Sequence, residues 1–182
     1  MSVKAVIDTN VFVSALWSAN PASPPFRTYR AMLNQLFVPL YSDEIIEEYE
    51  EVLHRSKFGF DTGQADEIID IVRRFGERVI PAEPGDKTFP DPDDKVFYCV
   101  ALAAQDETAK LVTGNTKHFP SAPFVVSPAE FAAMLDEVRR MRHEAFVSEC
   151  LQSKAEYEAG LGKHTTAKEL MADIMSSLDD ED

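Results

Sequence analysis

Apolar runs of strand length alternate with stretches of helical periodicity along this chain, and this alternation limits the possible folds more than any other feature. The strand-like runs cover residues 3–7, 38–41, 78–82, 110–113 and 124–126. Between them, apolar residues recur at helical spacing, for example in residues 26–37 and 65–75. This alternation is typical of an α/β domain. We therefore predict an α/β fold with a central parallel sheet.

Three of the predicted helices have recognisable start signals. Ser42 can cap a helix that has an acidic first turn, where the helix dipole favours carboxylates. Pro92 opens the segment DDKVFYCVALAA, which we expect to be a buried helix because apolar residues occur on nearly every side of it. Ser127 and Glu130 form a capping box, which predicts a helix over about residues 128–141.

The character of the chain changes after roughly Val138. Charged residues become denser there and no further strand-like run follows, so we divide the chain into a domain of residues 1–137 and a helical C-terminal extension of residues 138–182. Within the extension, helical periodicity continues to about Ala159 and is then interrupted by two glycines. Thr166 and Glu169 offer a second capping box for a short final helix.

The net charge limits the choice of partners. The chain carries 32 acidic residues against 18 lysines and arginines, a formal charge of −14. This charge disfavours loose electrostatic attraction to nucleic acids or anionic lipids. A polyanionic substrate would therefore need local help, and clustered carboxylates could supply it by binding a hard divalent cation. Alternatively, the acidic residues serve only solubility.

The sequence shows neither a membrane span nor a secretion signal. It has no run of about 18 apolar residues, and the N-terminus lacks the charged, apolar and cleavage regions of a signal peptide. The two cysteines, Cys99 and Cys150, lack CxxC spacing, which argues against a zinc site or a disulfide framework. We expect a cytoplasmic protein that does not contact membranes.

Four oxygen-bearing side chains are predicted to converge at one edge of the sheet. Asp8 directly follows the first strand-like run, and Asn115 follows the fourth. Because parallel α/β sheets bind ligands at the carboxyl ends of their strands, both residues would face one cleft. Asp94 lies in the first turn of the helix that Pro92 opens, and Glu48 lies beside the apolar stripe of its own helix. Both are positioned to point toward Asp8.

Each of these acids also has a purely structural interpretation. Asp94 would suit the first turn of a helix without any function. Glu48 has several glutamate neighbours and could be one more solvated charge. Asp8 could form an Asx-type turn or cap a helix, but a buried carboxylate costs several kcal/mol unless a cation or donors satisfy it. Asp8 is therefore the residue that most favours a functional site.

Four segments carry a resemblance to a known family. They are, in chain order, IDTNVFVSAL, SDEIIEEYEEVLHRSKF, DPDDKVFYCVALAA and LVTGNTKHF. In this order and spacing they resemble the PIN-domain family, and within it the bacterial and archaeal VapC-like toxins of toxin–antitoxin systems. The resemblance covers about residues 3–136. It implies a three-layer α/β/α sandwich and metal-dependent cleavage of RNA.

The resemblance assigns roles residue by residue. Asp8, Glu48 and Asp94 match the family's first three acids, so they would be catalytic and would hold Mg²⁺ or Mn²⁺. Asn10 matches the small polar residue two positions after the first acid. The family's fourth acid falls on Asn115, which offers a carbonyl oxygen to a cation but removes one negative charge. A second ion should therefore bind more weakly than the first.

Further residues are candidates for supporting roles. We expect Asp91 or Asp93 to assist Asp94, and Asn10 and Thr113 to act as donors that orient the metal ligands. Candidate contacts to substrate phosphates are the cations Lys117, His118, Arg27, Arg30, Arg55 and Lys57. Exposed loop charges more often only interact with solvent.

The resemblance and its exceptions leave more than one function open. On the first hypothesis the chain is a metal-dependent endoribonuclease and the toxin of a toxin–antitoxin pair. On the alternative it is a PIN-fold binding protein with a weakened metal site that acts through a protein partner. A haloacid-dehalogenase phosphatase also begins with Asp at a strand end, but it needs a second Asp where Asn10 stands.

The family also implies partners: RNA as substrate, an antitoxin protein, and a second copy of the chain in a homodimer. The stretch EYEAGLGKHTTAKELMADI loosely resembles antitoxin segments. Alternatively, the extension is an amphipathic oligomerisation or packing helix pair. Its buried residues would then be Phe146, Leu151, Leu170 and Ile174.

Overall fold

Five short strands form one parallel sheet in the computed structural model, which describes residues 3–18, 20–105 and 109–159. They are β1 (Lys4–Ile7), β2 (Val38–Tyr41), β3 (Glu77–Arg78), β4 (Ala109–Val112) and β5 (Val125–Val126). The strand order is β3-β2-β1-β4-β5, and every neighbouring pair is parallel. The chain therefore reverses its direction of travel between β1 and β4, which is where such sheets bind ligands.

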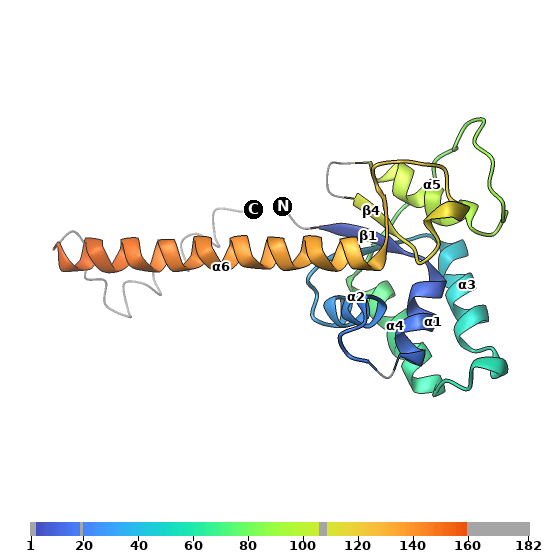
Figure 1. The fold of residues 1–182 in the computed structure, drawn as a ribbon, viewed down its shortest axis with the longest axis horizontal. Coiled ribbons are helices and arrows are strands. Elements are labelled where there is room, and N and C mark those ends of the chain that lie inside the picture. The colour runs from blue at the N-terminus through green and yellow to red at the C-terminus, as the bar shows by residue number, and fades with distance from the viewer. Residues whose placement is uncertain (1–2, 19, 106–108, 160–182) are drawn as a thin grey trace, which may run out of the picture. The chain divides into compact units, whose positions relative to one another are not determined.

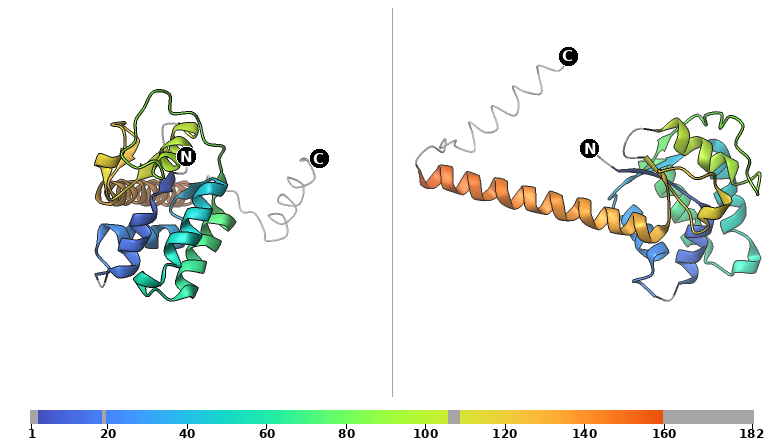
Figure 2. Two further views of the ribbon diagram at one scale, coloured as in Figure 1. Left: turned by 90° about the vertical axis from the view of Figure 1, so that its right-hand side faces the viewer. Right: turned by 45° about the horizontal axis from the view of Figure 1, so that its top comes forward.

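Helices cover both faces of this sheet. They are α1 (Thr9–Trp17), α2 (Pro24–Leu33), α3 (Asp43–Leu53), α4 (Thr62–Phe75) and α5 (Lys95–Ala103), followed by α6 (Pro128–Glu158), with the short 3₁₀ helices η1 (Ser56–Phe58) and η2 (Thr116–His118). Figures 1 and 2 show α5 on one side of β1 and β4, with α1 to α4 on the other. The predicted three-layer α/β/α sandwich is confirmed.

The two-sided cover explains why the central strands read as continuous apolar runs. Ala5, Val6 and Ile7 of β1 are buried, as are Leu111 and Val112 of β4. A parallel strand covered by helices on both faces needs apolar side chains at successive positions rather than at alternate ones. The sequence pattern and the layered architecture therefore have the same cause.

Several elements differ from their predicted bounds. β3 ends at Arg78 instead of continuing through residues 78–82, with one further ladder bond from Val79 N–H to the Tyr41 carbonyl (2.8 Å). Pro81 has no N–H to donate, so this edge strand cannot continue. α2 ends at Leu33 because Gln35 adopts a positive φ of 53°.

The chain divides into two compact units, Met1–Glu137 and Val138–Asp182. The predicted capping box is confirmed, since Glu130 Oε2 accepts from both Ser127 N–H (2.8 Å) and Ser127 Oγ (2.7 Å). The helix that it starts continues to Glu158 rather than ending near residue 141.

Phe146 and Leu151 of α6 are 64% and 62% exposed in the single chain, so they are not buried by packing within it. Their burial in an oligomer stays a prediction. Leu170, Ile174 and the second capping box lie outside the described residues. Over the described ranges, no helix combines the length and apolar character that crossing a membrane requires.

Candidate active site

Asp8 lies at the carboxyl end of β1, where it also caps α1. Its Oδ1 accepts from the backbone N–H of Asn10 (2.9 Å), and its Oδ2 accepts from Thr113 Oγ1 (2.6 Å). The residue is only 2% exposed, and burial raises its pKa although both donors oppose the shift. The capping interpretation is therefore correct, and it concerns the same carboxylate that was predicted to be functional.

Tyr49 fixes the position of α3 against this strand end. Its hydroxyl donates to the backbone carbonyl of Ile7, the last residue of β1. Its ring packs edge-on against Phe12 with centroids 5.3 Å apart, and lies 6.2 Å from the ring of Phe97. Because Tyr49 is fully buried, the preceding residue, Glu48, is held at the boundary between the core and the protein surface.

Glu48 is half-buried and is not simply a solvated charge. Its Oε1 accepts a hydrogen bond from Thr9 Oγ1 at 2.6 Å. Burial, together with the charges of Asp8, Asp94 and Asp93, raises the pKa of Glu48 to about 7, although the hydrogen bond from Thr9 opposes the shift. Glu48 is therefore electrostatically coupled to three other acids from different parts of the chain.

Asp94 is the residue immediately before α5, but its side chain makes no capping hydrogen bond. The carboxylate is 14% exposed, and its Oδ2 lies 3.3 Å from His118 Nδ1. Burial raises the pKa of Asp94, the charge of Asp8 raises it further, and the contact with His118 lowers it. A helix-start role does not account for this arrangement.

His118 has a role that the sequence did not reveal. The sequence offers His118 only as a candidate phosphate contact, whereas in the structure it is the hydrogen-bond partner of Asp94. It ends η2, in the loop that follows β4, and β4 pairs with β1. The pairing of β4 with β1 brings the loop after β4 close to the carboxyl end of β1. This proximity is the signal that could have indicated a role for His118 in the site.

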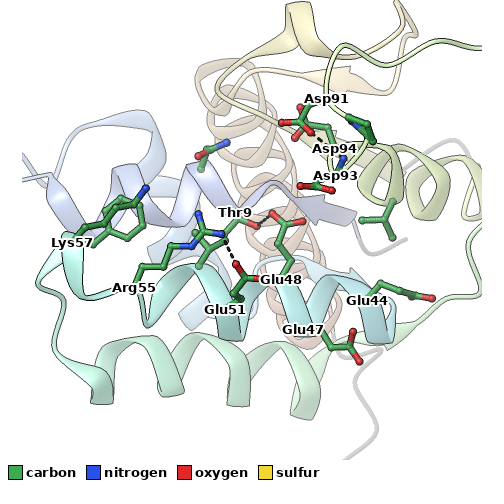
Figure 3. Close-up of a pocket in the computed structure, with 15 residues that line it drawn as sticks. Thr9, Glu44, Glu47, Glu48, Glu51, Arg55, Lys57, Asp91, Asp93 and Asp94 are labelled. Carbon is green, nitrogen blue, oxygen red and sulfur yellow. Dashed lines mark hydrogen bonds and ion pairs between the residues drawn. The ribbon is translucent and has the colours of Figure 1, made fainter.

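Glu48 and Asp94 border one open cavity of about 580 Å³ (Figure 3). Its lining includes Thr9, Asn10, Glu48, Asp91, Asp93 and Asp94, together with Arg55, Lys57 and Phe58. Asp91 Oδ1 accepts from the backbone N–H of Asp93 (3.1 Å), which ties these two assisting candidates together. The buried Asp8 does not line the cavity itself.

Several of the other candidates are held away from this cavity. The backbone N–H of Asn115 donates to Thr113 Oγ1 (3.0 Å), but the Asn115 side chain is exposed and does not line the cavity. Arg27 pairs with Asp136. Arg30 and Lys117 are exposed and are not among the lining residues.

The chemistry of the donor set suits a hard divalent cation. Carboxylate oxygens are the ligands that Mg²⁺ and Mn²⁺ prefer, and a cation would relieve the mutual repulsion of Asp8, Glu48 and Asp94. Over the described part of the chain, however, no group of three or more His, Cys, Asp or Glu side chains has a geometry that would hold a metal. The donor set fits in its chemistry, but its members are not preassembled into a coordination sphere.

Comparison with known proteins agrees with the fold and the order of these residues. The model of the PIN domain family matches residues 4–117, which contain Asp8, Glu48, Asp94 and Asn115. Neither the curated proteins nor the solved structures gave a match to this chain. The matched range covers more than half of the chain, including strands β1 to β4. The chain therefore belongs to the PIN domain family.

Proposed function

We propose that this chain is a metal-dependent endoribonuclease that hydrolyses RNA phosphodiesters at the cavity beside Glu48 and Asp94. PIN domains are generally nucleases. The observation that carries the proposal is the coupling of three carboxylates at the strand ends. Burial raises the pKa of Asp8, Glu48 and Asp94, and the charge of Asp8 raises the pKa of the other two.

The chain's own residues would prepare the site for this reaction. Thr113 and the Asn10 N–H hold both oxygens of Asp8, so that this carboxylate has one fixed orientation. Thr9 holds Oε1 of Glu48, and His118 holds Oδ2 of Asp94. Mg²⁺ or Mn²⁺ bound by these three acids would supply an acidified water molecule and positive charge for the phosphate. The hydrogen-bond donors around the acids would then limit how far the ligands move.

The experiment is cleavage of end-labelled bacterial RNA by the purified protein with Mn²⁺, with Mg²⁺ and with EDTA. We expect metal-dependent cleavage that the variant Asp94→Asn lacks. Asp70→Asn is the matched control, because Asp70 is an exposed acid on α4 that does not line the cavity. Cleavage that survives in Asp94→Asn or in EDTA would contradict the proposal.

One observation favours the alternative of a binding protein with a weakened metal site. No group of three or more acids is preassembled to hold a metal among the described residues, and Asn115 is exposed and does not line the cavity. Thermal unfolding with and without Mn²⁺ separates the two functions. Stabilisation of the wild type that Asp8→Asn abolishes supports the nuclease. Equal unfolding temperatures with and without Mn²⁺ support the binding protein.

The choice of Asp8→Asn follows from the capping role of this residue. An asparagine at position 8 can still accept from the Asn10 N–H, whereas alanine would remove the cap of α1 and cost about 0.5–2 kcal/mol. A loss of metal response in Asp8→Asn therefore reports on the removed charge rather than on a damaged helix.

The toxin role, the antitoxin partner and the homodimer are part of the same proposal. Expression of a toxin should arrest growth, and Asp94→Asn should abolish the arrest. The exposed Phe146 and Leu151 of α6 support an interface with a second protein. Replacing both with glutamate should lower the molecular mass in solution if the extension forms the homodimer, and should leave it unchanged if it does not.

A further inference from the structure

We propose that Lys57 and the rings of Trp17, Phe58 and Phe60, which adjoin the cavity through Lys57 and Phe58, bind an unpaired nucleotide of the RNA. We call these four residues the aromatic cluster. The inference rests on the proposed ribonuclease function and assigns a binding subsite next to the same cavity. It adds a base-stacking surface to the phosphate-cleaving acids.

The three rings form an ordered surface that joins two distant segments. The centroids of Trp17 and Phe58 lie 5.1 Å apart in an edge-on arrangement, and Phe58 and Phe60 are stacked at 5.4 Å. Trp17 Nε1 donates to the Phe58 carbonyl (3.3 Å), which ties the end of α1 to η1. Trp17 is nevertheless 60% exposed. A ring that served only the core would be more fully covered, so this face is available to a ligand.

A cation accompanies the rings. Lys57 Nζ lies 4.8 Å from the centroid of the Phe58 ring. The neighbouring Arg55 is instead bound by Glu51, with its Nη2 2.5 Å from Glu51 Oε1. On a chain of net charge −14, Lys57 therefore supplies local positive charge directly beside exposed aromatic surface. Stacking rings beside a cation are the usual way in which proteins bind single strands.

The aromatic cluster meets the cavity of the acids through Lys57 and Phe58, whereas Trp17 and Phe60 pack beside Phe58 and do not line it. Lys57, Arg55 and Phe58 line the same space as Glu48, Asp91, Asp93 and Asp94. Figure 3 shows Lys57 and Arg55 on the opposite side of Glu48 from Asp91, Asp93 and Asp94. The volume of about 580 Å³ lies within the range of roughly 300–1,000 Å³ that is common for small-ligand sites. A nucleotide held at the aromatic cluster would therefore place a neighbouring phosphate toward the acids.

Single-stranded RNA fits this surface better than a duplex. In a duplex the bases stack on one another and only the backbone is offered to the protein, whereas an unpaired base can stack on a side-chain ring. The acidic end also repels phosphates until a cation neutralises it, so the aromatic cluster is the end that attracts RNA without metal. The cluster would thus select unpaired regions before any cleavage takes place.

The test uses the fluorescence of Trp17, the one tryptophan of the chain. The full-length protein is titrated in EDTA with an eight-nucleotide oligoadenylate, with a duplex of equal length, and with an abasic ribose-phosphate strand of equal charge. We expect the oligoadenylate to change the emission and to bind about five- to fiftyfold more tightly than the abasic strand. Anisotropy of a labelled oligonucleotide measures the variants that lack the tryptophan.

Two variants and a matched control pair sharpen the test. Trp17→Leu and Lys57→Gln should each weaken oligoadenylate binding by about fivefold or more. Arg74→Gln and Phe75→Leu should leave it unchanged, because Arg74 lies over the Phe75 ring (5.3 Å) outside the cavity. Circular dichroism shows which variants remain folded, and Lys57→Gln keeps the test valid if Trp17→Leu does not fold.

The outcomes separate this inference from the proposed function. Equal affinities for the single strand, the duplex and the abasic strand would overturn the inference, as would wild-type binding by both cluster variants. Variants that bind RNA normally but lose a protein partner would also overturn it, since the surface would then be a protein interface. Tight oligoadenylate binding without any Mn²⁺-dependent cleavage would instead support the aromatic cluster and contradict the nuclease. A raised KM with unchanged kcat in Lys57→Gln supports both.

Discussion

The two ends of the cavity differ in the partner that they require. At the acidic end, burial and mutual repulsion raise the pKa of Glu48 and Asp94, so these carboxylates gain from a cation. At the aromatic end, Lys57 lies over a ring and Trp17 is largely exposed, so this end gains from an anion that carries a base. On our two proposals, binding and cleavage of RNA would therefore be separable, because binding at the aromatic end would need no metal and cleavage at the acidic end would.

The acidic end itself has a buried part and an open part. Asp8 is sealed from solvent and has donors on both oxygens, whereas Glu48 and Asp94 reach the cavity with one oxygen each bound by a protein donor. The buried carboxylate is therefore fixed, and the two open ones retain freedom to meet a ligand. The following predictions test these contrasts.

The largest effect is expected from removing the charge of Asp8. Asp8→Asn should lower metal-dependent RNA cleavage by about 100-fold or more, because charge stabilisation by a bound cation is worth several kcal/mol. The same substitution should leave metal-free oligoadenylate binding within about twofold of the wild type, since the aromatic end does not depend on it. Single-turnover cleavage and fluorescence titration measure the two quantities. A parallel loss of both would show that the two ends act as one.

The next largest effect concerns the buried part of the acidic end. Thr113→Val keeps the shape of the side chain but removes the donor to Asp8 Oδ2, which should destabilise the metal-free protein by about 1.5–3 kcal/mol at pH 7. The loss should shrink as the pH falls through the raised pKa of Asp8, because a protonated carboxyl needs the donor less. Urea unfolding in EDTA at several pH values gives both results.

Thr28→Val is the matched control for this prediction. Thr28 is equally buried, but its hydroxyl donates to the Pro24 carbonyl rather than to an ionisable group. Thr28→Val should therefore lower the free energy of unfolding by an amount that does not vary with pH. The same pH dependence in both variants would contradict the role assigned to the bond between Thr113 and Asp8.

A smaller effect is expected in the pH dependence that Glu48 contributes. Its pKa is about 7 in the folded protein, above the ordinary value of 4.5, so the folded state holds a proton that the unfolded state releases. The stability of the metal-free protein should therefore fall as pH rises from about 5 to 7.5, by about 1–2 kcal/mol after allowance for solvent screening. Glu48→Gln should make this slope shallower, as measured by urea unfolding in EDTA, while the raised pKa values of Asp8 and Asp94 keep part of it. If unfolding free energy depended equally on pH in the wild type and in Glu48→Gln, the raised pKa of Glu48 would be contradicted.

The smallest effect distinguishes the two cations of the aromatic end. Arg55 is already neutralised by Glu51, whereas Lys57 contacts a ring. Arg55→Gln should therefore weaken oligoadenylate binding by less than about twofold, well below the effect of Lys57→Gln, because an exposed ion pair contributes little. Anisotropy titrations at one salt concentration compare the two variants. A larger loss in Arg55→Gln would mean that RNA displaces Glu51.

Local patterns in the sequence were sufficient to predict much of the fold. The apolar runs at residues 3–7 and 38–41 are strands, and the Ser127 capping box starts a helix, because such patterns depend on neighbours a few residues away. The placement of Asp8 at a buried strand end also followed from sequence alone. The end of β3 was predicted less well, because an edge strand has weak apolar signals.

Other features depended on contacts between distant parts of the chain. Asp94 could have been a simple helix cap, and only its contact with His118, 24 residues away, shows otherwise. Asn115 stands at the position of the family's fourth acid, where this sequence departs from the family, and it does not line the cavity. The bond from Trp17 to Phe58 spans 41 residues, and no local pattern in the sequence pointed to the aromatic cluster.

The sequence by itself determined the α/β class, the central strands and the identity of the acids, because periodicity, burial of apolar runs and end-capping are local properties of the chain. Only the tertiary structure decided which of these acids share a cavity, which donors hold them, and which rings gather around Phe58 at its other end. Those relations arise when β1 and β4 become neighbours and Tyr49 ties α3 to the end of β1. Packing of distant segments sets the electrostatic environment of each group, and that environment is what raises the pKa of Glu48 and Asp94.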